Sequence, residues 1–216
     1  MNTTLLFAEL LIIGLQASVW LFVLMLVVFG VNWLQALATI GLADWQTVIV
    51  VIALSIIYVI GIIVDRLADF AFTAWDRKMR NRIFPNAPLP IGVMRFQLGK
   101  DNEYLNRQFE YTRSRIRISR ASILNFVLTT VFGVWLIVQL QFPSPAEKTK
   151  FIVVALCCGF LLTLSAIYTW HKLTQTYISL VKSNWDLLLS QRKSEKQGSS
   201  FTGKQKRTTP IRPKAG

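Results

Sequence analysis

The chain has very few of the residues on which metal and nucleophilic chemistry depend. Its 216 residues include a single histidine, His171, and two adjacent cysteines, Cys157 and Cys158. Neighbouring side chains on a helix point about 100° apart, and the two cysteines lie in an apolar run. They are therefore interpreted as small hydrophobic residues rather than as a disulfide. One histidine cannot supply the ligands of a zinc site at that place, so we expect neither a metal nor a cofactor.

Motifs of enzymatic chemistry are missing as well. The sequence contains no G-x-x-x-x-G-K-[ST] phosphate loop, no G-x-G-x-x-G, no H-E-x-x-H, no C-x-x-C and no G-x-S-x-G. The acids of the central region each lie within one helical turn of Lys or Arg, which indicates paired or solvated charges rather than an acid–base pair. We therefore expect that the protein is not an enzyme.

Acidic residues are also scarce, whereas apolar residues are concentrated in long runs. The chain has 11 acids against 24 Lys and Arg, and its hydrophobic content is 53%. Four apolar runs cover residues 5–29, 45–64, 121–140 and 151–170. A helix of 20 residues rises about 30 Å, the thickness of a hydrocarbon core. The sequence predicts an all-α, polytopic membrane protein with four transmembrane helices. The first run lacks a basic flank and is longer than a signal-peptide core, so we interpret it as a retained span.

Lysine and arginine are distributed very unevenly between the segments that join these runs. Residues 30–44 contain none and residues 141–150 contain Lys148 and Lys150, whereas residues 65–120 contain twelve and residues 171–216 contain ten. The positive-inside rule therefore predicts that the central segment and both termini are cytoplasmic, in a bacterial inner membrane or its equivalent.

The runs divide the chain into five parts. Residues 1–64 and 121–170 are expected to form two transmembrane hairpins. Between them, residues 65–120 are expected to form a charged cytoplasmic helical stalk, interrupted by a turn over residues 83–99 that holds Pro85, Pro88 and Pro90. Helical periodicity continues after the fourth run through residues 171–191. Residues 192–216 are predicted to be a disordered basic tail, because they hold too few large apolar residues to form a core.

Two stripes of opposite charge occupy the stalk. Asp65, Asp69 and Asp76 share one helical face, and the second stripe consists of Arg113, Arg117 and Arg120. If the two helices are antiparallel neighbours, Asp65 is expected to pair with Arg120 and Asp69 with Arg117. Two other interpretations remain open. The stripes are solvated faces that fix topology, or the arginines bind the phosphates of a lipid or a nucleotide.

Polar residues within the apolar runs are candidate functional positions. Glu9 and Gln16 lie in the first run, and Asn125 and Thr129 lie in the third. An ionisable residue inside a span indicates a functional site. Here Glu9 is also close enough to the cytoplasmic end of its span to reach water, and Gln16 is also suited to a hydrogen bond between helices.

The expected partners follow from charge. The basic segments are expected to contact anionic lipid headgroups, at about 1 kcal/mol per basic residue near the surface. Other copies of the chain and a soluble cytoplasmic protein are expected partners too. RNA is an alternative target of the tail, but nucleic acid is disfavoured because the attraction carries no specificity.

Three functions are compatible with these features. The first is an oligomer whose stalk receives a partner or ligand and couples that event to the spans, with a pore or a perturbed membrane as the output. Its lumen would carry Gln16, Asn125 and Thr129. The second is a membrane anchor or scaffold subunit that recruits a soluble protein through the stalk and tail. The third is a small transporter that depends on Glu9.

Overall fold

The protein consists mainly of long helices, in a computed structural model that describes residues 3–30, 32, 45–85, 87–100 and 102–205. Over these residues there are five helices. They are α1 (Thr3–Phe29), α3 (Gln46–Ile83), α4 (Ile91–Lys100), α5 (Glu103–Gln139) and α6 (Pro145–Gln205). The prediction of an all-α fold is confirmed.

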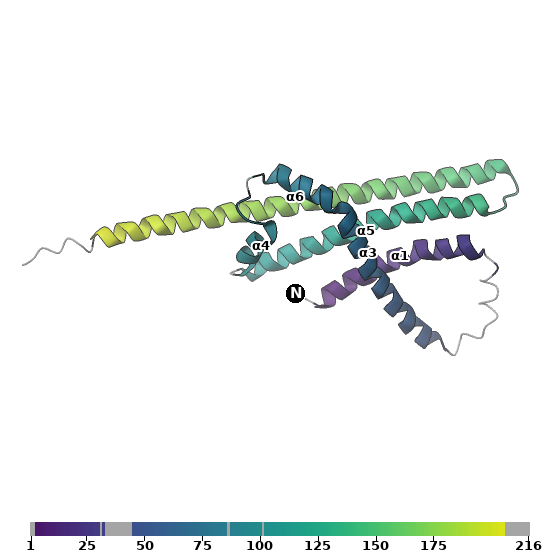
Figure 1. Ribbon diagram of the computed structural model, residues 1–216, viewed down its shortest axis with the longest axis horizontal. Coiled ribbons are helices and arrows are strands. Elements are labelled where there is room, and N and C mark those ends of the chain that lie inside the picture. Colours follow the sequence, from purple (N-terminus) through teal and green to yellow (C-terminus); the bar gives the residue numbers. More distant parts are fainter. Residues whose placement is uncertain (1–2, 31, 33–44, 86, 101, 206–216) are drawn as a thin grey trace, which may run out of the picture.

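The helices are arranged around one long hairpin (Figure 1). α5 and α6 run antiparallel beside each other, and a short turn after α5 joins them. α1 packs against both α3 and α5, whereas α3 crosses α5 steeply and continues to α4. The short helix α4 lies against α5 and α6, at the end of the hairpin away from the turn.

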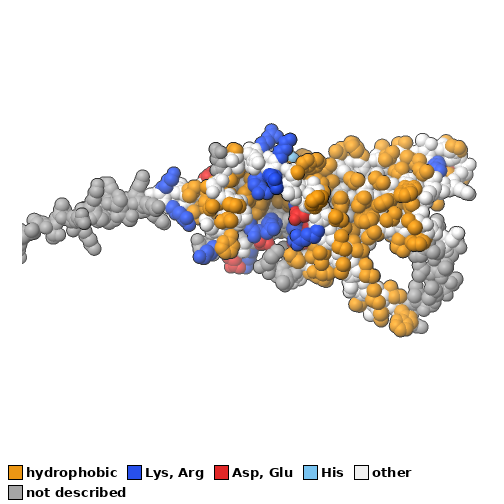
Figure 2. Space-filling view, in the orientation of Figure 1, with side chains coloured by type: hydrophobic (Ala, Val, Ile, Leu, Met, Phe, Trp, Pro, Cys, Tyr) orange, Lys and Arg blue, Asp and Glu red, His pale blue; other side chains and the backbone are white. Residues whose placement is uncertain are grey.

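Four of the helices, α1, α3, α5 and α6, are long and apolar enough to cross a membrane. Their apolar parts are largely exposed: all side chains from residue 46 to residue 56 of α3 are exposed, whichever face of the helix they occupy. Figure 2 shows hydrophobic side chains covering one half of the molecule and most of the Lys, Arg, Asp and Glu side chains gathered on the other. A helix that is apolar all round needs a nonpolar surrounding.

Three clusters of buried side chains hold the helices together. The first lies between α1, α3 and α5 and includes Ile13, Val64 and Ala121. The second joins α3, α5 and α6 through Phe72, Ile116 and Trp170. The third packs α4 on the hairpin around Met94, Phe109, Val181 and Trp185. The charged side chains described below lie where the first and second clusters meet.

The prediction of a turn over residues 83–99 is wrong in its second half, because residues 91–99 belong to α4. Proline is harmful inside a helix but fits its first turn, where no intrahelical partner exists for an N–H group. Pro90 lies immediately before α4, and its carbonyl accepts hydrogen bonds from the backbone N–H groups of Val93 and Met94. Pro90 therefore starts a helix, and the described part of the irregular segment is limited to residues 84, 85 and 87–90.

The helical extension of the fourth run is longer than predicted. α6 ends at Gln205 rather than near residue 191, so the prediction of disorder is wrong for residues 192–205. The sequence between Pro145 and Pro210 contains no proline that would stop the helix. The rest of the predicted tail, residues 206–216, lies outside the described residues.

Two glycines allow α1 and α3 to cross at backbone contact. A Cβ atom added at Gly14 would overlap the carbonyl oxygen of Ile57, and one added at Gly61 would overlap that of Leu10. Small residues at a helix crossing permit close approach and strong van der Waals packing.

We predict that Gly61→Ala lowers the thermal stability of the purified protein in detergent, by about 1–3 kcal/mol, because the added methyl group overpacks this crossing. The matched control is Gly133→Ala in α5, since a Cβ there meets no described atom within 4 Å. Alanine should stabilise α5 at that position, by up to about 1 kcal/mol. Circular dichroism during heating measures the unfolding midpoint of each variant. Equal midpoints for Gly61→Ala and Gly133→Ala would contradict the close crossing.

Candidate functional site

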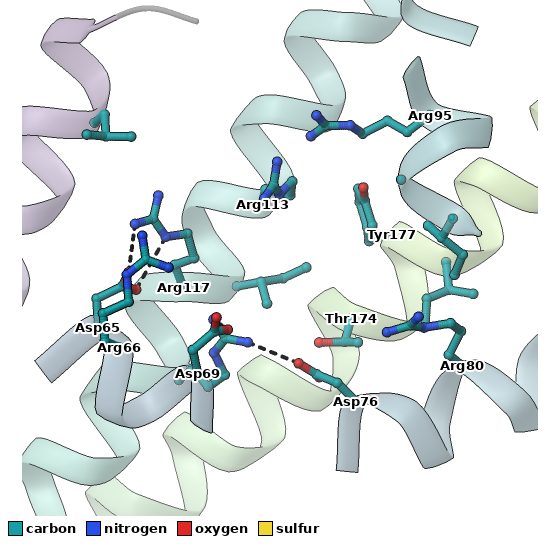
Figure 3. Close-up of a pocket in the computed structure, with 16 residues that line it drawn as sticks. Asp65, Arg66, Asp69, Asp76, Arg80, Arg95, Arg113, Arg117, Thr174 and Tyr177 are labelled. Carbon is teal, nitrogen blue, oxygen red and sulfur yellow. Dashed lines mark hydrogen bonds and ion pairs between the residues drawn. The ribbon is translucent and has the colours of Figure 1, made fainter. Parts of the chain in front are cut away.

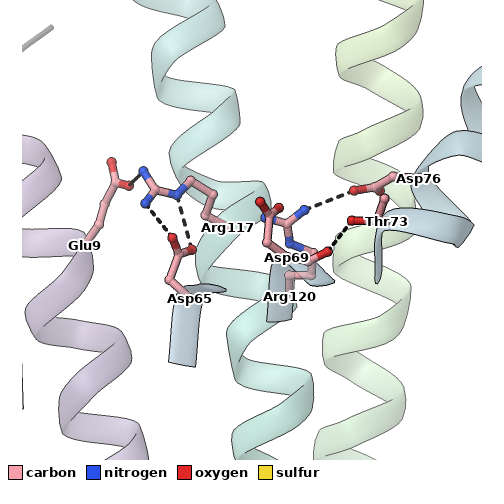
Figure 4. Close-up of polar contacts among 7 residues, drawn as sticks. All are labelled: Glu9, Asp65, Asp69, Thr73, Asp76, Arg117 and Arg120. Atoms are coloured by element: carbon pink, nitrogen blue, oxygen red, sulfur yellow. Dashed lines mark hydrogen bonds and ion pairs between the residues drawn. The ribbon is translucent and has the colours of Figure 1, made fainter. Parts of the chain in front are cut away.

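Arg117 of α5 connects three helices through two buried carboxylates. Its Nη2 lies 2.8 Å from Asp65 Oδ2 and its Nε lies 3.3 Å from Asp65 Oδ1, a two-point contact with α3. Its Nη1 lies 3.4 Å from Glu9 Oε2 on α1. Only 5% of the Asp65 side chain and 7% of that of Glu9 are exposed. We call Glu9, Asp65 and Arg117 the three-helix junction (Figure 4).

The contact with Asp65 stabilises the protonated form of Arg117. The hydrogen bond to that carboxylate raises the pKa of the guanidinium above its already high ordinary value, and burial opposes this only in part. Arg117 therefore stays protonated. Breaking a buried ion pair by removing one partner typically costs about 3–5 kcal/mol, because the other charge is left unpaired away from water.

Arg120 forms a second bridge, one turn along α5. Its Nη2 lies 2.7 Å from Asp69 Oδ1 and its Nη1 lies 3.0 Å from Asp76 Oδ2, both on α3. Burial raises the pKa of Asp76 above its usual value, although the charge of Arg120 pulls it down. Two atoms remain without a hydrogen-bond partner among the described residues, Arg120 Nε and Asp76 Oδ1.

The predicted pairing of the two stripes is wrong in register. Asp65 pairs with Arg117 rather than Arg120, and Asp69 pairs with Arg120 rather than Arg117. The expectation assumed that the two helices run antiparallel, in which case residue numbers would rise on one helix as they fall on the other. Because α3 instead crosses α5 (Figure 1), both sets of numbers rise together from one pair to the next.

The polar residues of the apolar runs meet between α1 and α5. Ser122 Oγ donates a hydrogen bond to Gln16 Oε1 at 2.9 Å, and Trp20 Nε1 donates one to Asn125 Oδ1 at 3.0 Å. Asn125 is 1% exposed. The half-buried Thr129 lies one turn further along α5. The sequence analysis did not identify Ser122 and Trp20 as hydrogen-bond partners of these residues, although Ser122 shares a helical face with Asn125 and Thr129.

A cavity of about 520 Å³ opens beside the ion pairs, between α3, α4, α5 and α6. Figure 3 shows Thr174 and Tyr177 of α6 between Arg80 of α3 and Arg95 of α4, with Arg113 nearby on α5. Six arginines and three aspartates line it. Arg66, Arg80 and Arg113 take part in no ion pair with any described residue. The lining therefore has an excess of three positive charges.

Two further groups that line this cavity, Arg95 of α4 and Tyr177 of α6, are partly buried. Arg95 Nη1 lies 3.0 Å from Glu110 Oε1, but the atoms are not aligned for a hydrogen bond. Burial raises the pKa of the Tyr177 phenol, so this group is neutral and able to donate. The sequence offered no signal for the participation of Thr174, Tyr177 or Arg95, because only the tertiary packing of α4 and α6 brings them to the stripes.

The described residues do not form a metal site. Over the described part of the chain, no group of three or more His, Cys, Asp or Glu side chains is placed to hold a metal ion. Comparison with protein-family models, with curated proteins and with solved structures gives no match to this chain. The arrangement of its own side chains is therefore the basis for the function proposed below.

We predict that a double-mutant cycle on Asp65→Ala and Arg117→Ala gives a coupling free energy within about 0.5–3 kcal/mol, the range for residues in one ion-pair network. The matched cycle on Asp69→Ala and Arg117→Ala tests the rejected register and should give a clearly smaller value. The free energies come from denaturant titrations of the detergent-solubilised protein. A larger coupling in the second cycle than in the first would contradict the observed register.

Proposed function

We propose that the chain is a non-enzymatic, polytopic membrane protein that crosses the bilayer four times. Both termini and the charged half of the molecule lie on the cytoplasmic side, and α3, α5 and α6 extend from the spans into the cytoplasm. The exposed apolar surface of all four long helices supports this placement. The near absence of Lys and Arg from the segments that join the spans on the opposite side supports the orientation.

The function that the geometry supports best is coupling between the cytoplasmic helices and the spans. The observation that carries it is the three-helix junction, which lies where the apolar and charged parts of α3 and α5 meet. A ligand or partner protein that shifts α3 relative to α5 on the cytoplasmic side would disturb the Asp65–Arg117 contact. Because Glu9 holds α1 through the same guanidinium, the disturbance would reach the first span.

The output we propose is a change in membrane permeability by an oligomer of the chain. If α1 separates from α5, Gln16 and Asn125 lose their partners on the opposite helix, whereas Ser122 keeps its hydrogen bond to the Ile118 carbonyl. Ser122 and Asn125 then form a polar stripe on α5 without partners on α1. One such stripe cannot line a water-filled path on its own, whereas several copies around an axis can. Polar groups inside a bilayer need partners or water, so association of copies is the expected response.

A second function, recruitment of a soluble protein to the membrane, is favoured by a different observation. Several aromatic side chains of the charged half of the molecule are exposed, among them Phe70 at 85%, Phe96 at 71% and Tyr104 at 74%. Aromatic residues in a charged surrounding are typical anchors of protein interfaces. Under this alternative the spans serve as an anchor, and the junction contributes stability alone.

The test is the permeability of liposomes that contain the purified protein. We expect Arg117→Gln to increase leakage of a small dye above the wild-type level, because it releases α1 from α5. The control is Arg82→Gln, an exposed arginine of α3 outside the ion pairs, which should leak like wild type. Chemical crosslinking reports the oligomer in the same samples. If Arg117→Gln is folded and crosslinks normally but its liposomes remain tight, recruitment replaces permeability as the proposed output.

A further inference from the structure

The cavity beside the ion pairs contains donors that the protein itself does not satisfy. Thr174 lines it and is only 6% exposed, and its buried Oγ1 has no hydrogen-bond partner among the described residues. Arg120 Nε likewise has no hydrogen-bond partner among the described residues, and Arg120 is 7% exposed. Leaving a buried polar group unpaired typically costs about 1–3 kcal/mol. Two such donors at one cavity point to a ligand that accepts hydrogen bonds there.

The charge of the lining specifies the sign of that ligand. Arg66, Arg80 and Arg113 have no ion-pair partner in the described chain, while the three aspartates of the cavity are engaged by Arg117 and Arg120. In Figure 3 Arg113 of α5 and Arg80 of α3 lie on opposite sides of Tyr177 and Thr174. Guanidinium groups form two-point contacts with phosphate oxygens and are well suited to a divalent anion.

An unpaired carboxylate oxygen of Asp76 helps to distinguish which kind of anion fits the cavity. Asp76 Oδ1 is buried without a partner among the described residues, beside the arginines. A fully deprotonated anion such as sulfate offers it no donor. A phosphate monoester or inorganic phosphate carries an ionisable O–H whose second pKa lies near neutrality, so it can accept from the arginines and donate to Asp76.

We propose that this cavity binds a phosphate group of the monoester class, either free phosphate or the terminal headgroup of a lipid such as phosphatidic acid. Its volume of about 520 Å³ lies within the range of small-ligand sites, about 300–1,000 Å³. Leu6 of α1 lines it together with residues of α3, α4, α5 and α6. A bound phosphate would therefore contact the charged half of the molecule directly beside the three-helix junction.

This inference deepens the proposed function, since it names the chemical class of the ligand to which the coupling would respond. A phosphate bound among the arginines of this cavity would attract both α3 and α5 and so stabilise the crossing of the two helices. The junction next to it would then remain closed, and loss of the ligand would loosen it.

The experiment uses the full-length protein in nanodiscs of two compositions. In phosphatidylcholine nanodiscs, isothermal titration calorimetry measures the binding of inorganic phosphate and of sulfate. In phosphatidylcholine nanodiscs that contain phosphatidic acid, the thermal midpoint of the protein reports headgroup binding. The variants are Arg80→Gln and Arg113→Gln, both exposed and free of ion pairs in the described structure. Arg82→Gln, two residues from Arg80 but outside the cavity, is the matched control.

We expect phosphate to bind wild type and Arg82→Gln equally, and Arg80→Gln and Arg113→Gln about tenfold more weakly, the loss of one charge-assisted hydrogen bond. Binding in the first arm identifies free phosphate as the source. A thermal shift only with phosphatidic acid, lost in the same two variants, identifies the lipid headgroup.

Three results would overturn the proposal: no binding in either arm, equal binding by all variants, or sulfate binding as tight as phosphate. None of these depends on permeability. A tight liposome with intact phosphate binding would therefore reject the proposed output alone, and a leaky Arg117→Gln liposome without phosphate binding would reject the ligand alone.

Discussion

The structure depends on two buried carboxylates that share one partly buried guanidinium. Asp65 of α3 and Glu9 of α1 are almost completely buried, and a charge removed from water must be paired. Arg117 of α5 supplies that partner, at distances of 2.8 Å and 3.4 Å. The requirement fixes where α1 and α3 meet α5. It also explains why an acid is tolerated in the first apolar run, since the charge of Glu9 is compensated by Arg117, which lies in α5 just before the third run.

The remainder of the molecule follows from a separation of apolar and charged surface. On one side of the junction the helices carry exposed Val, Ile, Leu and Phe and meet through small residues, as at Gly14 and Gly61. On the other side they carry the arginines and acids, and the short helix α4 closes a conventional apolar core around Phe109 and Val181. The cavity lies in the charged half next to the three-helix junction, so a ligand there is placed to affect the junction.

Much of this architecture could be predicted from the sequence, because the length of an apolar run and the position of charges are local properties. α1 coincides with the first apolar run within two residues. α3 and α5 begin and end within a few residues of the limits set by the second and third runs together with the predicted turn over residues 83–99. The acidic and basic stripes were recognised because helical periodicity places each on one face. Membership of Glu9 in the same network could not be foreseen, since nothing in the sequence gives the angle at which α1 and α3 approach α5.

The errors have equally specific causes. The register of the stripes was wrong because a steep crossing replaced the assumed antiparallel packing. Pro90 was interpreted as a breaker, whereas it begins α4. Thr174 and Tyr177 escaped notice because they are single polar residues on an otherwise regular helix, and only tertiary structure makes them the wall of a cavity. Whether such a residue lines a cavity depends on the helices packed against it, and helical periodicity alone does not give that packing.

The central claim, that Arg117 holds α1 against α5, is tested most directly by a distance measurement across that contact. Spin labels at Thr4→Cys and Tyr111→Cys, two exposed positions on α1 and α5, would be placed in a protein carrying Cys157→Ser and Cys158→Ser. Electron–electron double resonance in nanodiscs should give one narrow distance distribution, which Arg117→Gln broadens and lengthens while Arg82→Gln leaves it unchanged. An identical narrow distribution in Arg117→Gln would show that other contacts hold α1, and would contradict the account.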